Sequence, residues 1–556
     1  MKRTLFLFGS IILSCLTAFC QQLNNVIKSP DGKICVTVTD DNGKPQYAVK
    51  YGDKVFIQPS LLGVITNHAD YSENLRLKDV KTSKLDENYS LPNIKQSNVH
   101  YVANEAVCKY YRDTVNVLDV IFRVSNRDVA FRYLIHPAGA HLSCTITKEL
   151  TQFKPATGST TFLCPQAKPM GGFAGTSPSY ETSYTLDDAM GKNGWGEGYT
   201  FPCLFKNQND GWMLVSETGV DGGYCAGRLL GESDGTYCIG FPQSAECNGN
   251  GTVSPGISLP GKTPWRTITL GNTLANIVET TVPFDVVERK YEPSKKYTYG
   301  KGSWSWIIGM DASCNYNDQK KYIDFSAAMG YQSVLVDALW DTQIGRDKIA
   351  ELAAYGAKKG VSLYLWYNSN GYWNDAFQSP RGIMNDPILR KKEMKWMQQT
   401  GIKGIKVDFF GGDKQMMMQV YEGILSDAND YGLEVIFHGC TIPRGWERMY
   451  PNYVASEAVL ASENLHFSQD FCNREAVNAC LHPFVRNTIG SMDFGGSALN
   501  KYYNADNKHG NHRVTSDVYA LATAVLFQSA VQHFALAPNN LQDAPSWAID
   551  FMKNVP

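Results

Sequence analysis

A lysine and an aspartate two positions apart are the residues of this chain best suited to chemistry. They lie in the run Gly404-Ile405-Lys406-Val407-Asp408-Phe409-Phe410, which has the composition of a buried strand. Because side chains alternate along a strand, Lys406 and Asp408 point to the same face. Burying opposite charges is costly unless they pair with each other or face a cleft. The run therefore predicts either a structural ion pair or an active site at the end of a strand.

Two glutamates, Glu457 and Glu463, add to the carboxylates that could reach such a cleft. They are six residues apart and do not share a helix face well, so we expect them on a loop or a strand end. Crowded carboxylates acquire different pKa values, so one stays ionised while another keeps its proton, and a cation can also relieve the crowding. A nucleophile and an acid/base of this kind can cleave a glycosidic bond. The alternative is that both glutamates are solvated loop charges.

From about residue 301 the sequence alternates short apolar runs with helical segments. The predicted strands are 303–307, 333–337, 362–367, 402–410 and 434–438, and the predicted helices include 390–399, 414–431 and a late one over 518–536. This spacing is typical of a parallel (β/α)8 barrel of the TIM type, in which the site lies at the C-terminal ends of the strands. Candidate sugar-contacting residues near these ends are Asp337, Trp340, Trp366, Asn368, Lys406, His438 and Asp493. For Trp340, Trp366, Asn368 and His438, packing in the core is an equally good interpretation.

The chain before the barrel differs in character. Residues 21–285 contain short alternating runs separated by Gly, Asn and Asp turns, which predicts an antiparallel β-sandwich. Residues 286–300 are charged and rich in tyrosine, and we interpret them as a linker. The catalytic barrel is then expected over residues 301–556.

The first 20 residues have the pattern of a signal peptide. Lys2 and Arg3 precede the apolar run from Leu5 to Leu16, which is too short to span a bilayer, so export to the periplasm or the medium is expected. No later segment has the length and apolar character of a membrane helix. The formal net charge of -2 argues against nucleic acid as the main partner. The cysteines form no CxxC pair that would indicate a zinc or iron–sulfur site, and their disulfide pairing stays open.

Several motifs in a fixed order resemble those of glycoside hydrolase family 97, in particular its retaining α-galactosidase branch. They are Tyr180-Glu181-Thr182-Ser183-Tyr184, Ser303-Trp304-Ser305-Trp306, Lys406-Val407-Asp408-Phe409, Phe437-His438-Gly439, Tyr450-Pro451-Asn452, the Glu457/Glu463 pair and Ser491-Met492-Asp493-Phe494. The resemblance runs through nearly the whole chain after the signal peptide. It implies that Asp408 is the nucleophile and Glu463 the general acid/base. It also implies that Glu181 and Glu457 are ligands of Ca²⁺.

Gly439 bears on the stereochemistry that the resemblance implies. Inverting members carry a glutamate base at this position, directly after the histidine, whereas this chain has glycine there and an aspartate at position 408. Both features indicate the retaining members, which form a glycosyl-enzyme. Family members usually carry a small C-terminal β domain, and the chain stops at Pro556, about where that domain is expected to begin, so the domain is apparently missing.

The resulting expectation is an exo-acting retaining α-galactosidase that hydrolyses terminal α-galactosides by double displacement. One alternative is a β-L-arabinopyranosidase of the same branch, because that sugar matches galactose except for the missing hydroxymethyl group. A carbohydrate-binding protein without catalytic activity is the alternative from another class. An oligosaccharide or simple glycoside is the expected partner, and the natural glycan and the oligomeric state stay open.

Overall fold

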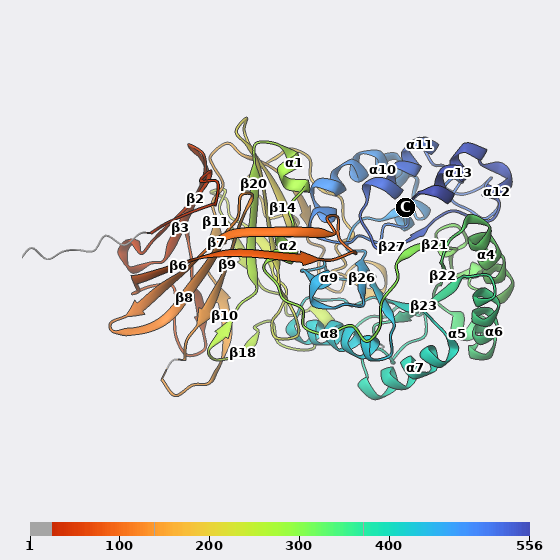
Figure 1. Ribbon diagram of the computed structural model, residues 1–556, viewed down its shortest axis with the longest axis horizontal. Helices are drawn as coiled ribbons and strands as arrows, with labels where there is room; N and C mark the ends of the chain where they lie inside the picture. The colour runs from red at the N-terminus through yellow and green to blue at the C-terminus, as the bar shows by residue number, and fades with distance from the viewer. Residues whose placement is uncertain (1–24, 138, 371, 556) are drawn as a thin grey trace, which may run out of the picture.

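The computed structural model describes residues 25–137, 139–370 and 372–555, and the predicted signal peptide lies outside them. An antiparallel β domain is followed by a parallel β/α barrel-like domain, and the two lie side by side (Figure 1). Between α2 (Val282–Asp285) and β21 (Gly300–Trp304) the chain has no regular element. The predicted order of an antiparallel β part and a β/α barrel is confirmed at this level.

The β domain contains three antiparallel sheets within the described residues. A four-stranded sheet consists of β1 (Val26–Lys28), β2 (Ile34–Thr39), β3 (Gln46–Tyr51) and β4 (Lys54–Leu61). A three-stranded sheet consists of β5 (Val64–Thr66), β10 (Ser143–Glu149) and β18 (Gly256–Ser258). The thirteen-stranded sheet holds β6 (Arg76–Ser90), β7 (Asn98–Arg112), β8 (Val115–Val124), β9 (Asp128–Ile135), β11 (Gln152–Phe153), β12 (Thr160–Pro165), β13 (Asp188–Ala189), β14 (Tyr199–Asn207), β15 (Gly211–Thr218), β16 (Arg228–Gly231), β17 (Tyr237–Gly240), β19 (Gly261–Lys262) and β20 (Trp265–Gly271), with α1 (Leu274–Val278) after it.

Aromatic side chains join the four-stranded sheet to the large one. The ring of Tyr47 on β3 lies 6.3 Å from that of Phe122 on β8 and 5.1 Å from that of Phe131 on β9. Alternation along β2 places Ile34, Val36 and Val38 in this core and the residues between them toward its outer side. The inner faces of the two sheets therefore pack on a shared apolar layer.

The barrel-like domain is built on parallel strands. Seven occur in the described residues, in the order β26-β25-β24-β23-β22-β21-β27. Their bounds are β21 (Gly300–Trp304), β22 (Ser333–Val336), β23 (Ser362–Asn368), β24 (Gly404–Asp408), β25 (Glu434–Phe437), β26 (Tyr453–Ser456) and β27 (Val531–Phe534). Beside β26, Met492 makes a single parallel bridge with Ser456, and its N–H donates to the carbonyl of Gln528, just before β27. The eighth strand of the expected barrel is thus reduced, among the described residues, to one bridging residue.

Helices surround these strands. The longer ones are α4 (Tyr316–Met329), α6 (Arg346–Ala357), α7 (Pro387–Thr400), α8 (Gln415–Asp430), α10 (Gln469–Leu481), α11 (Asp517–Leu526) and α13 (Ser546–Asn554), and the short ones are α3 (Trp306–Gly309), α5 (Trp340–Gln343), α9 (Trp446–Met449) and α12 (Asn540–Asp543). Within the described ranges, no helix has the length and apolar character needed to cross a membrane.

Two predicted boundaries are wrong. The strand predicted over 303–307 ends at Trp304, because Ser305 turns into α3 and its hydroxyl contacts Ser313 Oγ and Gln319 Nε2 inside the fold. The helix predicted over 518–536 is α11 followed by β27. The run Val531–Phe534 is a strand beside β21, and a continuous apolar run cannot distinguish a buried strand from a buried helix.

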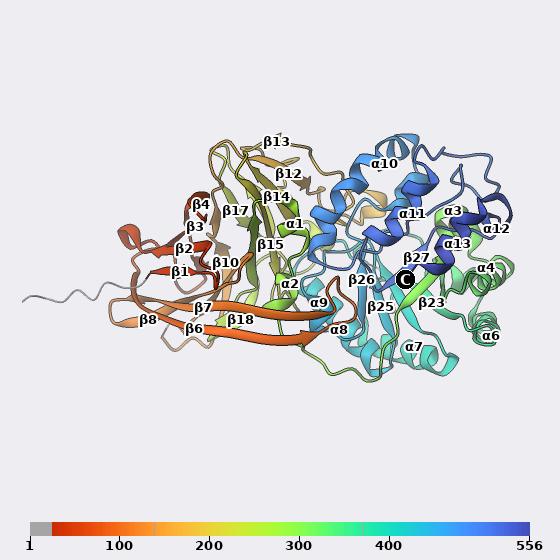
Figure 2. The ribbon, with the colours of Figure 1, turned by 45° about the horizontal axis from the view of Figure 1, so that its top comes forward.

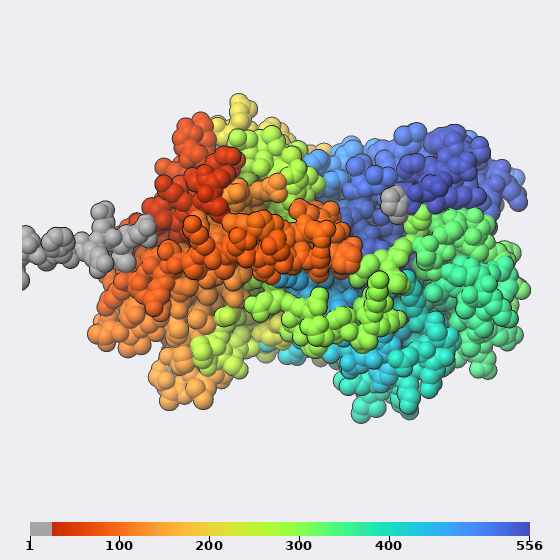
Figure 3. Space-filling model, in the orientation of Figure 1, coloured from red at the N-terminus to blue at the C-terminus, as the bar shows by residue number. Residues whose placement is uncertain are grey.

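The hairpin of β6 and β7 extends from the β domain onto the barrel (Figures 1 and 2). At its tip, Lys95 Nζ donates to the carbonyl of Thr488 at 2.8 Å and to that of Val278 at 2.6 Å. In the space-filling view the orange hairpin and the yellow-green linker both pass from one domain to the other on the same face (Figure 3). The two domains are therefore connected by more than the linker.

Candidate active site

Lys406 and Asp408 lie on the same face of β24, as the alternation predicted, and both are buried. Asp408 is the last residue of the strand, and Lys406 Nζ lies 3.6 Å from its Oδ2. A second carboxylate is closer: Asp337, directly after β22, has its Oδ2 3.0 Å from Lys406 Nζ. Two parallel strands separated by β23 thus bring a lysine and two aspartates together at their C-terminal ends, where barrel enzymes carry their chemistry.

Trp304, the last residue of β21, completes the environment of Lys406. The ammonium lies 4.1 Å from the centroid of the indole, and the indole Nε1 donates to Asp337 Oδ2 at 2.8 Å. Burial works against the charged ammonium, but the Asp337 and Asp408 carboxylates outweigh it and raise the pKa of Lys406. Lys406 is therefore a fixed positive charge beneath the site.

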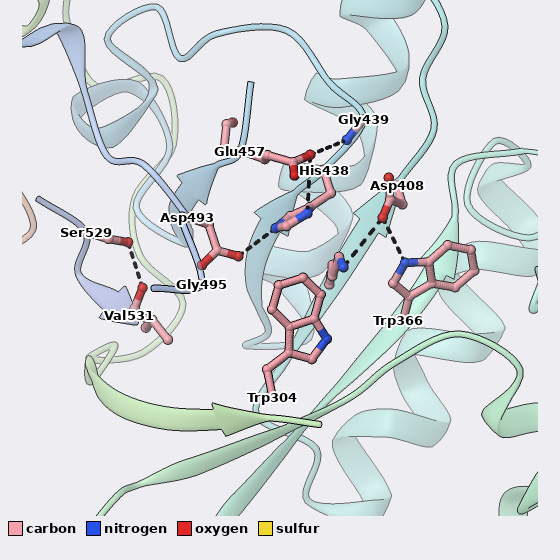
Figure 4. A network of polar contacts seen from close by, with 12 residues as sticks. Trp304, Trp366, Asp408, His438, Gly439, Glu457, Asp493, Gly495, Ser529 and Val531 are labelled. Atoms are coloured by element: carbon pink, nitrogen blue, oxygen red, sulfur yellow. Dashed lines mark hydrogen bonds and ion pairs between the residues drawn. The ribbon is translucent and has the colours of Figure 1, made fainter. Parts of the chain in front are cut away.

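Trp366 and Gly439 also lie against the carboxylate of Asp408. Trp366 Nε1 donates to Asp408 Oδ2 at 2.9 Å (Figure 4). Burial raises the pKa of Asp408, and the positive charges of Lys406 and His438 oppose that rise. Gly439 has a φ of +46°, and a Cβ built on it would lie 2.7 Å from Asp408 Oδ1. The glycine leaves the carboxylate the space that a side chain would take.

His438 lies between two carboxylates. Its Nε2 is 2.7 Å from Asp493 Oδ2 and its Nδ1 is 3.3 Å from Glu457 Oε2 (Figure 4). Burial lowers the pKa of His438, but Glu457 and Asp493 reverse this and raise it well above its ordinary value. Asp493 therefore supports a charged histidine.

Glu457 and Glu463 of the barrel and Glu181 of the β domain converge beside His438. Glu457 follows β26, Glu463 lies in a 3-10 turn (Ser462–His466), and Glu181 comes from the β domain. Burial raises the pKa of Glu463 well above its usual range, as does the nearby charge of Glu457, and the pKa of Glu181 is raised by the same two causes. Unlike the fully buried Glu457, both residues keep partial exposure. The two glutamates predicted to reach one cleft are therefore close together.

The cluster has the composition of a cation site. Ligand atoms of His438, Glu457 and Glu463 all lie within 4.8 Å of one another. Glu457 Oε2 accepts from the N–H of Gly439, whereas its Oε1 is buried with no hydrogen-bond partner among the described residues. Carboxylate oxygens are the ligands that Ca²⁺ prefers, and a cation would relieve the repulsion among these glutamates. The residues present thus fit a calcium ion.

Trp340 and Asn368 have other surroundings. Trp340 is fully buried, stacks on Trp396 and donates from Nε1 to the carbonyl of Trp366. Asn368, at the end of β23, bonds to the side chain of Asn374 and the N–H of Asn370. The structure places Trp340 in the packing behind the strands and Asn368 in the support of the following loop.

Sequence reasoning missed Asp311, which lies in a 3-10 turn (Met310–Ser313) near the site. Trp306 Nε1 donates to Asp311 Oδ1 at 2.8 Å, and Trp306 stacks on Trp304 with ring centroids 6.1 Å apart. Burial raises the pKa of Asp311, and so does Asp337. The Trp-Ser-Trp motif was a signal for this neighbourhood, but the aspartate stands in no strand or motif of its own.

A barrel that gathers a lysine, a histidine and several buried carboxylates at the C-terminal ends of its strands has the arrangement of a glycoside hydrolase. The family model described as "Glycosyl-hydrolase 97 N-terminal" matches residues 27–288. The model described as "Glycoside hydrolase 97" matches residues 296–459. The chain belongs to glycoside hydrolase family 97.

Three similar proteins are named for two different activities. A solved structure described as a β-arabinopyranosidase is 55% identical and superposes with a TM-score of 0.94, over 96% of this chain and 85% of that one. A probable retaining α-galactosidase of Streptomyces bingchenggensis is 28% identical, over 91% of this chain and 74% of the relative. A retaining α-galactosidase of Bacteroides thetaiotaomicron is 23% identical, over 90% and 76%.

Proposed function

We propose that the protein is a retaining glycosidase in which Asp408 is the nucleophile and Glu463 the general acid/base. The observation that carries this proposal is the contact between position 439 and Asp408. A side chain at position 439 able to activate water would collide with the carboxylate that lies there, so Asp408 replaces such a base. A close carboxylate in place of a water-activating base converts a single displacement into a double one.

The reaction then has two steps. Asp408 Oδ1 attacks the anomeric carbon while Glu463 gives its proton to the glycosidic oxygen, so that the glycosyl ester forms as the leaving group departs. Glu463, now ionised, takes a proton from water, whose oxygen attacks the anomeric carbon and releases Asp408. Asp408 can be ionised because Lys406 and the indole of Trp366 both favour its charged form, whereas Glu463 keeps its proton because burial raises its pKa well above the usual range.

We assign Glu181 and Glu457 as the residues that would hold Ca²⁺, with the acid/base Glu463 directly beside them. When bound, the ion supplies positive charge that neutralises crowded carboxylates and can polarise a sugar hydroxyl. Glu181 reaches this cluster from the β domain, so the ion would connect the two domains at the site. Asp337, Lys406 and Asp311 lie on the barrel side, where charged groups could bind the hydroxyls of the sugar.

For the substrate, the comparisons favour a β-L-arabinopyranoside over an α-galactoside. The relative named for the first activity is 55% identical to this chain, whereas the two named for the second are 28% and 23% identical. The sequence alone led to the opposite order. An α-galactoside remains the second candidate because the two sugars differ only by a hydroxymethyl group.

The two candidates are separated by the kcat/KM values for 4-nitrophenyl β-L-arabinopyranoside and 4-nitrophenyl α-D-galactopyranoside. We expect about a tenfold or greater preference for the arabinopyranoside, because a pocket shaped without room for the hydroxymethyl group discriminates by about that factor. A preference for the galactoside would reverse the assignment. Binding of either sugar without turnover would instead indicate the non-catalytic alternative.

The nucleophile is tested with Asp408→Gly. This variant should lose nearly all hydrolysis and regain part of it with azide, which fits into the space of the carboxylate and gives a glycosyl azide of the opposite anomeric configuration. Glu463→Gln is the matched control, since azide should not yield that inverted product when Asp408 is intact. An Asp408→Gly variant that keeps its activity without azide would refute the assignment.

A further inference from the structure

A buried network of charged and hydroxyl groups crosses from the β domain into the barrel close to the site. Its centre is Arg444, in the loop between β25 and α9, which is fully buried. Arg444 Nε donates to Glu217 Oε1 on β15 at 2.6 Å, and its Nη2 donates to the hydroxyl of Tyr180 at 3.3 Å. A barrel side chain is thus paired with two residues of the β domain.

The hydroxyl of Tyr180 contacts three side chains of the barrel. It donates to Asp413 Oδ2 at 2.7 Å, lies 3.2 Å from Thr441 Oγ1 and accepts from Arg444. Asp413 lies in the loop after β24, which ends at Asp408, and Thr441 lies in the loop after β25, which His438 directly follows. One hydroxyl therefore connects the β domain to both loops that continue from the site.

The network is anchored deeply on the β side. Glu217 also pairs with Arg266, which forms a bidentate pair with Glu149 inside the β domain. The N–H of Asp413 donates to Glu246 Oε2 at 2.7 Å, so the barrel loop is held there as well. Buried charges that are paired on every side fix one relative arrangement, because any shift leaves a charge uncompensated.

The position of Tyr180 in the chain gives this network a role at the site. Tyr180 directly precedes Glu181. The backbone of Tyr180 has a φ of +66°, a conformation that residues other than glycine rarely adopt. Cα atoms of adjacent residues are about 3.8 Å apart, so fixing the Tyr180 ring also fixes the backbone from which Glu181 extends. The strained backbone is retained because the surrounding contacts determine it.

We propose that Tyr180 is a positioning residue for cation binding: its hydroxyl, held by Asp413, Thr441 and Arg444, sets Glu181 of the β domain against Glu457 and Glu463 of the barrel. The inference rests on the proposed function, in which Glu181 is a calcium ligand. It adds that the affinity for Ca²⁺ is determined by an interdomain hydroxyl contact outside the ligand set.

Tyr180→Phe is the variant that tests the proposal, since it removes the hydroxyl and keeps the ring in the core. Residues that orient metal ligands typically change affinity by about 10–100-fold, so we expect Ca²⁺ binding, measured by titration calorimetry, to weaken by at least about tenfold. Tyr224→Phe is the matched control. Tyr224 is also buried in the β domain, but its hydroxyl has no hydrogen-bond partner among the described residues, so its affinity for Ca²⁺ should match the wild type.

A double-mutant cycle with Glu181→Gln separates positioning from general destabilisation. If Tyr180 acts through Glu181, Tyr180→Phe should weaken Ca²⁺ binding about tenfold in the wild type and less than about twofold in the Glu181→Gln background. Independent effects of the two changes, or a Tyr180→Phe variant with unaltered affinity, would overturn the inference. A wild type that binds no Ca²⁺ would instead refute the proposed cation site itself, which keeps the two failures distinct.

Discussion

Lys406 Nζ lies 3.6 Å from Asp408 Oδ2, and both side chains extend from the same face of one strand. The pairing places a permanent positive charge next to the proposed nucleophile. Because Lys406 also contacts Asp337 and lies over Trp304, it cannot swing away when the sugar binds. The charge therefore acts on Asp408 throughout the reaction.

Lys406→Met should move the acidic limb of the pH profile of kcat/KM to higher pH. The ammonium favours the ionised form of Asp408, so removing it raises the pKa of the carboxylate, and activity at pH 6 should fall by about 100-fold or more. Lys403→Met, just before the opposite end of β24 and paired with Glu434, is the control and should keep the wild-type profile. A folded Lys406→Met protein with an unshifted acidic limb would contradict the role given to Lys406.

Gly439→Ala should abolish most activity because the new methyl group takes the space of Asp408 Oδ1, 2.7 Å away. Displacing a reacting group by about 1 Å costs roughly 100-fold in rate. Gly401→Ala is the control. Gly401 has a φ of +80° and open space around its Cβ position, so its replacement by alanine carries only the backbone cost of a positive φ. If both alanine variants are equally active, the contact with Asp408 does not matter. Initial rates on the preferred nitrophenyl glycoside decide between these outcomes.

Removal of calcium should lower both the thermal midpoint and the activity. A ligand that binds only the folded state stabilises it by an amount that grows with the logarithm of its free concentration relative to Kd, and the crowded glutamates lose their counter-ion when it leaves. Burial and the nearby Glu457 raise the pKa of Glu181, so protons compete with Ca²⁺ for this ligand. The fall in the thermal midpoint caused by a chelator should therefore be larger at pH 7.5 than at pH 5. Scanning calorimetry with and without chelator measures it. An equal shift at both pH values would argue against carboxylate ligands.

Glu447→Gln should stabilise the protein at neutral pH and not in acid. Glu447 is buried, one of its oxygens has no partner among the described residues, and burial raises its pKa from 4.5 to about 7. As pH rises, Glu447 therefore ionises in the unfolded chain before it does so in the folded protein. The wild type loses stability as pH rises from about 4.5 to about 7, and this loss is complete above pH 7. The free energy of unfolding of the variant relative to wild type should grow by about 3 kcal/mol over that window.

Urea unfolding at pH 4.5, 6 and 8 measures this difference. Glu292→Gln serves as the surface comparison, because the side chain of Glu292 is 84% exposed and should give no such trend. A Glu447→Gln protein whose relative stability is independent of pH would show that the buried oxygen is solvated or paired in solution.

What the sequence by itself determined is local. Alternation along one strand was sufficient to place Lys406 and Asp408 on one face, and the spacing of strands and helices was sufficient to indicate a β/α barrel after an antiparallel β part. These features depend on residues near one another in the chain. The helix predicted over Val531–Phe534 is wrong because an apolar run is compatible with both a helix and a strand until its neighbours are known. The first barrel strand ends early, at Trp304, because the hydroxyl of Ser305 bonds to Ser313 and Gln319.

Only the tertiary structure decided which charges meet. Tyr180 and Arg444 are 264 positions apart, and His438 reaches Asp493 across 55. No periodicity reports such contacts, because the free energy of a buried charge depends on partners supplied by other segments. The same reason explains why the structure places Trp340 and Asn368 in supporting positions and brings Glu181, from the other domain, to the proposed cation site. A sequence pattern can show that a polar residue lies in an apolar segment. Only the packing of distant segments determines which group offsets the cost of burying it.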